Sequence, residues 1–317
     1  MKRANFVVAG ALVALSMFVM AAPAGALSPL PGRIYALADV GGTRGDLFRT
    51  TQTNSWFRLT SGLNFPESVA ASPDGSFAVM CASRGGASPY RIYRVAAAGG
   101  GLRNLIGNRQ GCGQTVSPDG AKVAYIDTGR GSAKLSVVGS RGGGHRVLYR
   151  FCAGCLYNPV WANGRIYFER KETGNVSADL EIYSVRARDG EGLRQHTNDR
   201  GALIDYNLAD VSRNGRKLLV IEREPGPPAV HSLSIIGLSP SGAFRSRRTI
   251  TSGAENIADA SFSPSGDSIA YARRTTSSDL SPYELWTGPL APGRWRTLFS
   301  VPSLSTLGTY SIDWVRR

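Results

Sequence analysis

The chain has few of the side chains and motifs on which hydrolases, nucleotide-binding enzymes and metal enzymes depend. Its 317 residues include only three histidines, and His145, His196 and His231 show no ligand spacing to one another or to a cysteine pair. No GxSxG elbow, HExxH helix, Walker loop or GxGxxG turn before a helix occurs. We expect His145 and His196 at the surface and His231 within a β-sheet. These absences disfavour an enzyme.

Long apolar stretches are also absent, except at the start of the chain. Lys2 and Arg3 precede the apolar run Phe6–Met20, and Ala24–Ala26 supplies the small residues of a signal-peptide cleavage site. We therefore expect residues 1–26 to be a secretory signal peptide and 27–317 to be a single domain. The apolar run is shorter than the ~20 residues of a spanning helix, so an uncleaved anchor is the weaker alternative. No lipid-anchoring cysteine and no later membrane-crossing segment is present, which predicts an extracellular, periplasmic or envelope-associated protein.

Acidic residues are outnumbered throughout the chain. The 23 Asp and Glu residues stand against 37 Lys and Arg, which gives a formal net charge of +14. An exported protein rarely meets nucleic acid, so this basicity favours anionic polymers of the cell envelope or acidic polysaccharide instead. The alternative is an arginine-rich surface without a specific partner. We expect a monomer.

One short turn motif recurs through the chain. Ser-Pro-Asp-Gly occupies Ser72–Gly75 and Ser117–Gly120, and degraded copies stand at Trp161–Gly164, Ser212–Gly215 and Ser263–Gly266. Successive motifs start 45, 44, 51 and 51 residues apart. This step matches the roughly 40–50 residues of a four-stranded propeller blade. No convincing amphipathic helix follows the leader, which argues against helical repeats.

Each motif is expected to form the tight turn between the two innermost strands of a blade. Proline presets φ for a type I turn, and glycine at the fourth position takes the left-handed φ that closes a hairpin with a bulge. An apolar run follows each turn, then an alternating strand such as Arg91–Val95 or Glu181–Val185, and then a short outer strand. Five complete units of four strands result, and the motifs themselves are expected to be structural.

A sixth blade is expected to be shared between the two ends of the chain. Gly32–Tyr35 copies Gly164–Tyr167, and Asp46–Arg49 and Trp56–Thr60 supply two further strands, but no inner strand precedes them. Tyr310–Trp314 has the pattern of the missing inner strand. We therefore predict an all-β fold, a six-bladed β-propeller with four-stranded blades. Its C-terminal strand pairs with the N-terminal strands and so removes the exposed sheet edges of an open array.

The cysteines are few and even in number, which predicts disulfides in an oxidising compartment. We expect Cys81 to pair with Cys112, because Cys81 ends a second strand and Cys112 begins the next inner strand on the same face. Cys152 then pairs with Cys155. The alternative is a bond from Cys112 to Cys152 or Cys155. The CxxC at Cys152–Cys155 lacks both a second zinc-ligand pair and the βαβ context of a redox enzyme.

The predicted inner strands differ in charge from the rest of the chain. They are the seven residues before each turn, namely 65–71, 110–116, 154–160, 205–211, 256–262 and 307–313. These 42 positions contain no Lys or Arg, although an even spread would place about five there. They contain five carboxylates, which are Glu67, Asp205, Asp210, Asp259 and Asp313. Because the inner strands surround the axis, the sequence predicts an acidic channel inside a basic ring.

Carboxylates that converge on a channel suit a hard cation such as Ca²⁺, or an amine-bearing or hydroxyl-rich ligand. Such a ligand would also meet Tyr157, Tyr206 and Tyr310 and the long excursions 173–179 and 275–282 at the channel mouth. The alternative is that short Asp side chains accept hydrogen bonds from the backbone at strand ends and only stabilise the fold. No other cofactor is expected.

The spaced Ser-Pro-Asp-Gly turns and the apolar strands after them resemble the TolB-type, WD-repeat-like β-propeller family of exported bacterial proteins. The resemblance covers about Arg33 to Arg317 and rests on Ser72–Gly75, Ser117–Gly120 and their three weaker copies. It concerns the propeller part only, because about six residues separate the expected cleavage site from the first strand. The family protein places a separate α/β domain there.

With this resemblance, we expect a non-catalytic protein- or glycan-binding scaffold in the cell envelope, with an envelope protein or an anionic glycan as its partner. A propeller enzyme that acts on polysaccharide or peptide through the acidic channel is the alternative. A third possibility is an architectural repeat protein whose acidic residues only satisfy backbone donors.

Overall fold

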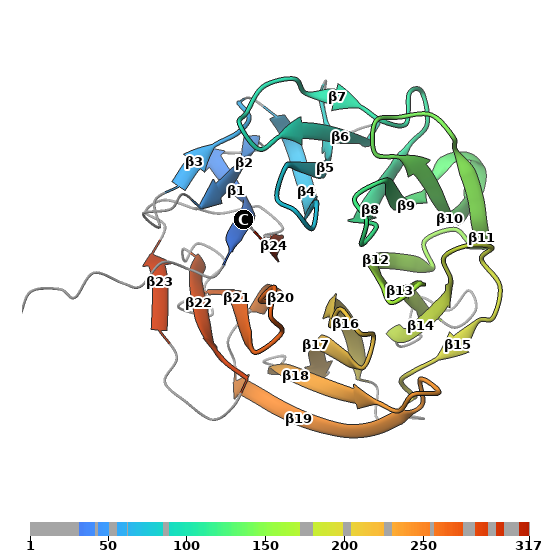
Figure 1. The fold of residues 1–317 in the computed structure, drawn as a ribbon, viewed down its shortest axis with the longest axis vertical. Helices are drawn as coiled ribbons and strands as arrows, with labels where there is room; N and C mark the ends of the chain where they lie inside the picture. The colour runs from blue at the N-terminus through green and yellow to red at the C-terminus, as the bar shows by residue number, and fades with distance from the viewer. Residues whose placement is uncertain are drawn as a thin grey trace, which may run out of the picture.

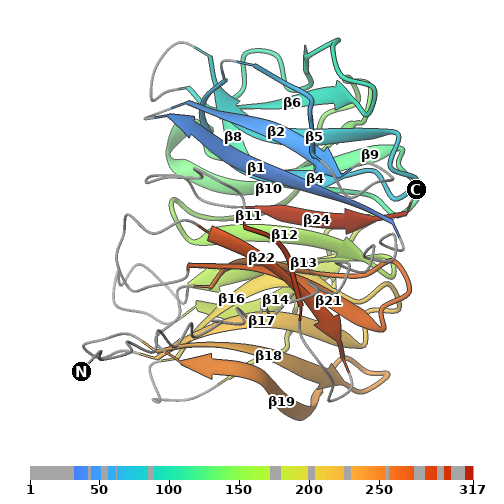
Figure 2. The same ribbon diagram turned by 90° about the vertical axis from the view of Figure 1, so that its left-hand side faces the viewer.

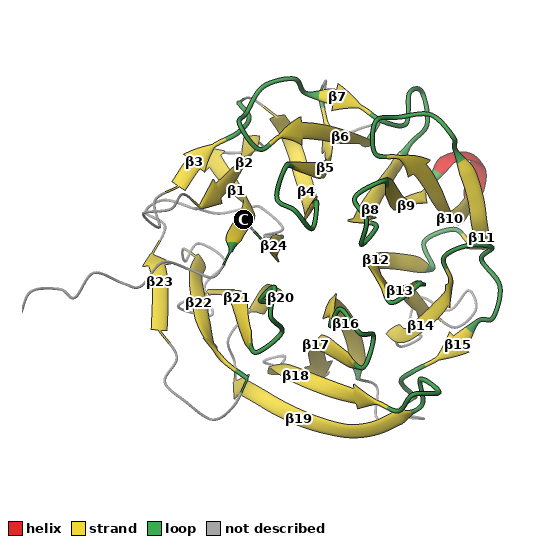
Figure 3. Ribbon diagram, in the orientation of Figure 1, coloured by secondary structure: helices red, strands yellow, loops and turns green. Residues whose placement is uncertain are grey.

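Six blades stand around a central axis in the computed structural model (Figure 1). The structure describes residues 32–41, 44–50, 56–61, 63–84, 89–171, 180–198, 204–224, 230–253, 257–274, 283–290, 296–300 and 311–316. Almost every regular element among them is a strand, and the single helical segment is the 3₁₀ turn η1 (Gly129–Gly131) at the rim (Figure 3). No helix within these residues is long and apolar enough to cross a membrane.

Blades 1 to 5 each consist of four consecutive antiparallel strands that run in order from the axis to the rim. Blade 1 contains β4 (Leu63–Ala71), β5 (Phe77–Ser83), β6 (Arg91–Ala96) and β7 (Arg103–Asn104). Blade 2 contains β8 (Gly111–Val116), β9 (Lys122–Asp127), β10 (Ser132–Gly139) and β11 (Arg146–Cys152). Blade 3 contains β12 (Leu156–Ala162), β13 (Arg165–Lys171), β14 (Leu180–Arg186) and β15 (Arg194–Gln195).

Blades 4 and 5 have the same four-strand order, and the outer strand of blade 4 is ten residues long. Blade 4 contains β16 (Asp205–Val211), β17 (Lys217–Glu224), β18 (Val230–Leu238) and β19 (Phe244–Gly253). Blade 5 contains β20 (Ile257–Phe262), β21 (Ser268–Arg274), β22 (Tyr283–Pro289) and β23 (Arg296–Ser300).

Blade 6 is built from both ends of the chain, as the sequence predicts. Its inner strand is β24 (Ile312–Val315), and β1 (Arg33–Gly41), β2 (Arg44–Thr50) and β3 (Trp56–Arg58) follow outward. The antiparallel register sets Ile34 opposite Trp314 and Tyr35 opposite Asp313. Figure 2 shows β24 lying beside β1 when the disc is seen edge-on. The predicted closure of the ring is therefore confirmed.

Four of the five turn motifs form the predicted hairpin turn. In each, the glycine N–H donates to the carbonyl of the first motif residue, at 2.7–2.8 Å, and the glycine φ is between 66° and 73°. The third motif differs, because β12 continues through Trp161 and Ala162 and so ends two residues later than expected. Asn163 and Gly164 then make a two-residue turn with φ of 47° and 70°. Positive φ at both positions is the signature of a type I′ hairpin, for which Asn-Gly is the favoured pair.

The buried core falls into six clusters, and each lies between two neighbouring blades. The cluster between blades 2 and 3, for example, contains Leu135, Ile166 and Phe168, all with no exposed surface. The cluster between blades 5 and 6 contains Trp314, which is 4% exposed. Blade faces are apolar because each must pack against the next one, so the core is a ring of interfaces around the axis.

Both expected disulfides are present. Cys81 of β5 is bonded to Cys112 of β8, with Cα atoms 5.2 Å apart, so this bond joins blade 1 to blade 2. Cys152 is bonded to Cys155 across the connection from blade 2 to blade 3. The alternative pairing of Cys112 is wrong.

Candidate functional site

Neighbouring blades are joined near the axis by side-chain hydrogen bonds as well as by packing. At every one of the six junctions a polar side chain of one blade binds the next blade, most often a backbone N–H of its inner strand. In ring order the pairs are Asp313 with Ala71 N at 2.7 Å, Ser68 with Gln114 at 2.9 Å, Thr115 with Trp161 N at 3.0 Å, Glu169 with Leu208 N at 2.6 Å, Asp210 with Phe262 N at 2.8 Å and Asp259 with Ile312 N at 2.8 Å. We call this set the junction girdle.

Three of the acceptors are the predicted aspartates Asp210, Asp259 and Asp313, which come from the consecutive inner strands β16, β20 and β24. In each, Oδ2 accepts the N–H of the next inner strand. The Oδ1 atoms of Asp210 and Asp259 accept the N–H of the following residue, at 2.7 and 2.8 Å. The carboxylates are thus held in place by the backbone, which is the role that the structural interpretation of these residues predicts.

These aspartates bind protons more tightly than ordinary carboxyl groups. Burial raises the pKa of Asp210 to about 6 and the pKa of Asp259 and of Asp313 to about 7. The negative charge of Asp210 raises the pKa of the other two further, whereas the backbone N–H donors lower it. Desolvation of the charged form exceeds the stabilisation from the hydrogen bonds. The channel therefore changes its charge near neutral pH.

Two cavities lie along the axis, and Asp210 and Asp313 line both of them. The turn-face cavity, of about 360 Å³, opens among the hairpin turns and is also lined by Trp161 and Trp314. The strand-start cavity, of about 160 Å³, lies toward the beginnings of the inner strands and includes Asp259. The carboxylates therefore form a narrow acidic section between two openings.

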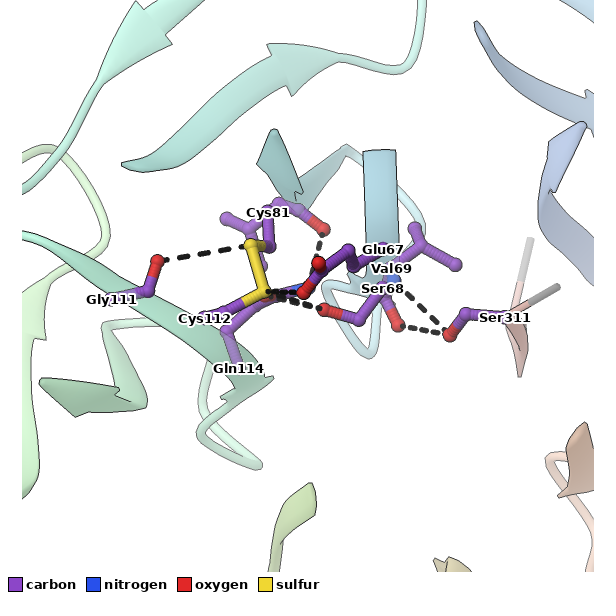
Figure 4. Close-up of a disulfide and its surroundings, with 9 residues drawn as sticks. Glu67, Ser68, Val69, Cys81, Gly111, Cys112, Gln114 and Ser311 are labelled. Atoms are coloured by element: carbon purple, nitrogen blue, oxygen red, sulfur yellow. Dashed lines mark hydrogen bonds between the residues drawn. A yellow bond between two sulfur atoms is a disulfide. The ribbon is translucent and has the colours of Figure 1, made fainter. Parts of the chain in front are cut away.

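Glu67 lies at the edge of the strand-start cavity, beside the disulfide that joins blades 1 and 2 (Figure 4). Its Oε2 atom is 3.0 Å from Cys112 Sγ. The hydroxyl group of Tyr90 contacts the Glu67 carboxylate. Burial and this carboxylate raise the pKa of Tyr90 to about 12. Glu67 therefore lines the channel from blade 1, next to the blade that carries Asp313, while its carboxylate is close to the disulfide and to Tyr90.

Of the other predicted site residues, the three that the structure describes do not line either axial cavity, namely Asp205, Tyr206 and Tyr157. Asp205 starts β16, and its Oδ1 accepts the N–H of Leu180 at 3.0 Å, which ties it to a rim-side strand. Tyr206 is 7% exposed and packs between blades 3 and 4. Tyr157 is exposed and donates to the Gly154 carbonyl next to the Cys152–Cys155 disulfide. Tyr310 and the excursions 173–179 and 275–282 lie outside the described residues.

Sequence reasoning missed Glu169, which lies on the second strand β13 and was therefore not counted among inner-strand carboxylates. It is 1% exposed and accepts from Leu208 N and from Asn158 Nδ2, the latter at 2.8 Å. Burial raises its pKa to about 7. An acidic residue directly after the apolar run Ile166–Phe168 was the available signal.

The prediction of a surface position was wrong for His196. His196 is 3% exposed, because its ring bridges blades 3 and 4 through Ser184 Oγ and the Gly242 carbonyl, each at 2.7 Å. Burial lowers its pKa to about 4. The His145 side chain is 21% exposed and faces Asp127. His231, 9% exposed in β18, lies within a sheet as expected.

The described residues place one group of three metal-ligating side chains close together, and its members are Glu67, Cys81 and Cys112. Both sulfurs are in the disulfide and offer no thiolate, so this group does not fit a metal ion. The three channel aspartates form no such group within the described residues.

Comparison with known proteins identifies the fold. No protein-family model and no curated protein matches the chain. TolB from Acinetobacter baumannii is similar in structure, with 16% identity over 89% of this chain and a TM-score of 0.68, and this chain spans 66% of its length. A chain of the nidogen/laminin complex is similar with 15% identity over 90% of this chain and 100% of its own, and a TM-score of 0.63. An oligogalacturonate lyase in complex with manganese is similar with 14% identity over 80% and 70% of the two chains, and a TM-score of 0.54. These likenesses show a β-propeller that binding proteins and enzymes share.

Proposed function

We propose that this chain is an exported, non-catalytic β-propeller that binds a protein partner of the cell envelope at the turn-face cavity. The observation that carries the proposal is the make-up of that cavity. The partly exposed Trp161 lines it with three prolines of the turn motifs and with the edge of the buried Trp314, and Asp210 and Asp313 lie along the axis beneath. Aromatic side chains in a desolvated recess are the usual anchors of protein–protein binding.

The charges suggest which part of a partner would enter. Oδ2 of Asp210 and of Asp313 accepts one backbone N–H, and a carboxylate has further acceptor sites that can receive a cationic group, such as a lysine, an arginine or an amino terminus. Arg213 and Arg316 stand among the lining residues for the acidic neighbours of that group. A cavity of about 360 Å³ accommodates a few side chains rather than a folded domain. A terminal or loop segment of the partner is therefore the expected ligand.

Export is supported by the basic and apolar start of the chain and by the two disulfides, which persist in oxidising compartments. Protein binding is supported by the similarity to TolB and to a chain of the nidogen/laminin complex. An anionic glycan remains the other partner class that the net charge favours.

Site-specific photocrosslinking in cells tests the proposal. A photoreactive phenylalanine analogue replaces Trp161 in the full-length chain, and the matched control places it at Phe244, which is 55% exposed on the outermost strand of blade 4. We expect discrete, protease-sensitive adducts at position 161 that are absent at position 244. The same bands at both positions, or none at 161, would contradict the proposed face.

A second function, an enzyme that acts on polysaccharide or peptide through the channel, is favoured by one observation. Asp259 and Asp313 have a pKa of about 7, in the range where a carboxyl group can act as a general acid. The test is a turnover screen on anionic glycans and peptides with Glu67→Ala, Asp205→Ala and Asp259→Ala. Activity that survives Asp259→Ala would exclude catalysis through that residue, and activity that disappears only with it would replace the binding proposal.

A further inference from the structure

The largest cavity described lies away from the axis, on blade 2. This side pocket, of about 840 Å³, is formed by the loop between β7 and β8, by β9 and β10 with the 3₁₀ turn between them, and by β11 with the turn before it. It shares no lining residue with either axial cavity. Its polar lining includes Asn108, Arg109, Asp127, Lys134, His145 and Arg150.

The side pocket is basic. Arg109, Lys134 and Arg150 stand against the single carboxylate of Asp127. Asp127 Oδ1 accepts the Gly129 N–H at 2.9 Å, and Lys134 Nζ donates to the Gly129 carbonyl at 3.1 Å. Among the residues that the structure describes, neither arginine side chain forms an ion pair or a hydrogen bond. Two guanidinium groups therefore remain free to bind an anion.

His145 adds an unsatisfied polar atom to this wall. Its Nε2 is screened from solvent, has no hydrogen-bond partner and lies 3.9 Å from Asp127 Oδ2. Burial and the charge of Arg109 lower the pKa of His145, so its ring is neutral at pH 7. Leaving a buried polar group without a partner is unfavourable, and a ligand hydroxyl near Asp127 and His145 would remove that cost.

We propose that the side pocket binds a sugar that carries an oxyanion, with Arg109 and Arg150 on the anionic group and Asp127, His145 and Asn108 on its hydroxyl groups. The volume lies within the range of pockets for organic ligands and is far larger than an inorganic anion requires. Planar guanidinium groups match the oxygen pairs of carboxylate, sulfate and phosphate. This binding site is independent of the proposed protein-binding cavity.

Calorimetric titration of the purified mature chain tests the proposal with matched ligands. Trigalacturonate carries carboxylates, its methyl ester keeps the hydroxyls without the charge, a sulfated trisaccharide changes the anion, and inorganic phosphate supplies an anion alone. We expect the acidic trisaccharides to bind and the methyl ester to bind at least about tenfold more weakly, the loss that a missing charged hydrogen bond gives. Whichever of the two trisaccharides binds more tightly identifies the anion.

The matched variants are Arg150→Gln and Lys134→Gln in the side pocket, and Arg245→Gln on the exposed face of β19 as a control with the same charge change. We expect about tenfold weaker binding for Arg150→Gln and no change for Arg245→Gln. Three results would overturn the proposal: no binding by either acidic trisaccharide, equal binding of the methyl ester, or equal weakening by all three variants. Phosphate that binds as tightly as the trisaccharides would do so as well.

Discussion

The axial channel and the side pocket place charged side chains in opposite situations. In the channel, Asp210, Asp259 and Asp313 are tied to the backbone of the next inner strand, so their geometry serves the junctions between blades. In the side pocket, the side chains of Arg109 and Arg150 form no ion pair or hydrogen bond with a described residue. Charged side chains at the axis therefore stabilise the junctions between blades, whereas unpaired charged side chains at the rim are available to a ligand.

The largest loss of stability is expected when the closure of the ring is disrupted, because the channel depends on that closure. Trp314→Ala removes a side chain that is 4% exposed and packs against Ile34 and Leu285 between blades 5 and 6. Loss of a buried aromatic side chain costs about 3–5 kcal/mol of unfolding free energy. Urea denaturation measures it, with Phe244→Ala at an exposed position as the control. A loss below about 1 kcal/mol would mean that β24 does not close the ring as described.

The second largest loss of stability is expected for changes in the junction girdle. Glu169→Ala leaves the Leu208 N–H and the Asn158 amide without their acceptor, which costs about 1–3 kcal/mol. Glu169→Gln retains a carbonyl oxygen for Leu208 N and should lose less than half as much. Urea denaturation at pH 8 compares the two. Equal losses of unfolding free energy in the two variants would show that the negative charge of Glu169, and not its hydrogen bond to Leu208, stabilises the junction of blades 3 and 4.

The channel should also make stability depend on pH in an uncommon direction for carboxylates. Burial raises the pKa of Asp259 and Asp313 to about 7, whereas the same carboxyl groups have a pKa of about 4 in the unfolded chain. Between about pH 4 and pH 7 the folded protein therefore binds more protons than the unfolded chain. The stabilising contribution of the two carboxyl groups is fully present below about pH 4 and is lost as the pH rises through 7.

The double variant with Asp259→Asn and Asp313→Asn should remove this dependence, by an amount on the order of a few kcal/mol between pH 8 and pH 5. Burial lowers the pKa of His196 to about 4, so its contribution to the stability of the folded protein is lost as the pH falls from 6.5 toward 4. This loss is the same in the parent and in the double variant. Melting temperatures at several pH values measure the difference. Parallel pH profiles would contradict the raised pKa values.

The smallest effect on folding is expected in the side pocket. Arg150→Gln and Lys134→Gln remove charges that form no ion pair with a described residue, so the unfolding free energy should stay within about 0.5 kcal/mol of the parent. The same urea experiment checks this. A loss of more than about 1 kcal/mol of unfolding free energy would show that these side chains stabilise the fold, as the channel aspartates do, and would contradict their role in a ligand site.

The fold followed from the sequence because its turns are local and chemically specific. Gly75, Gly120, Gly215 and Gly266 take positive φ where the motif requires it, and their spacing fixes the number of blades. The third turn was placed two residues early, since Asn163-Gly164 makes a type I′ turn without the preceding Ser-Pro. A degenerate motif gives the presence of a turn more accurately than its boundaries.

The candidate sites were harder to predict from the sequence, because they depend on which strands lie next to each other in the fold. The absence of Lys and Arg from the inner strands singled out Asp210, Asp259 and Asp313, which line the axial cavities, and ligand binding by them stays a prediction. The same rule included Asp205, which binds Leu180 instead, and omitted Glu169 on a second strand. Arg109, Lys134 and Arg150 come from a loop and two strands of blade 2, and nothing in their local sequence indicates that they share a pocket.

The pairing of β24 with β1 has a consequence for how the molecule is made. Val69 N and Ser311 Oγ, which bond across the junction of blades 6 and 1, are 242 positions apart in the chain. During synthesis, the hydrogen-bonding groups of β1 and of the inner edge of blade 1 stay unprotected until β24 is made, and contacts so distant in sequence form late. A chaperone that recognises free strand edges would have its longest opportunity to act on the first blades to emerge.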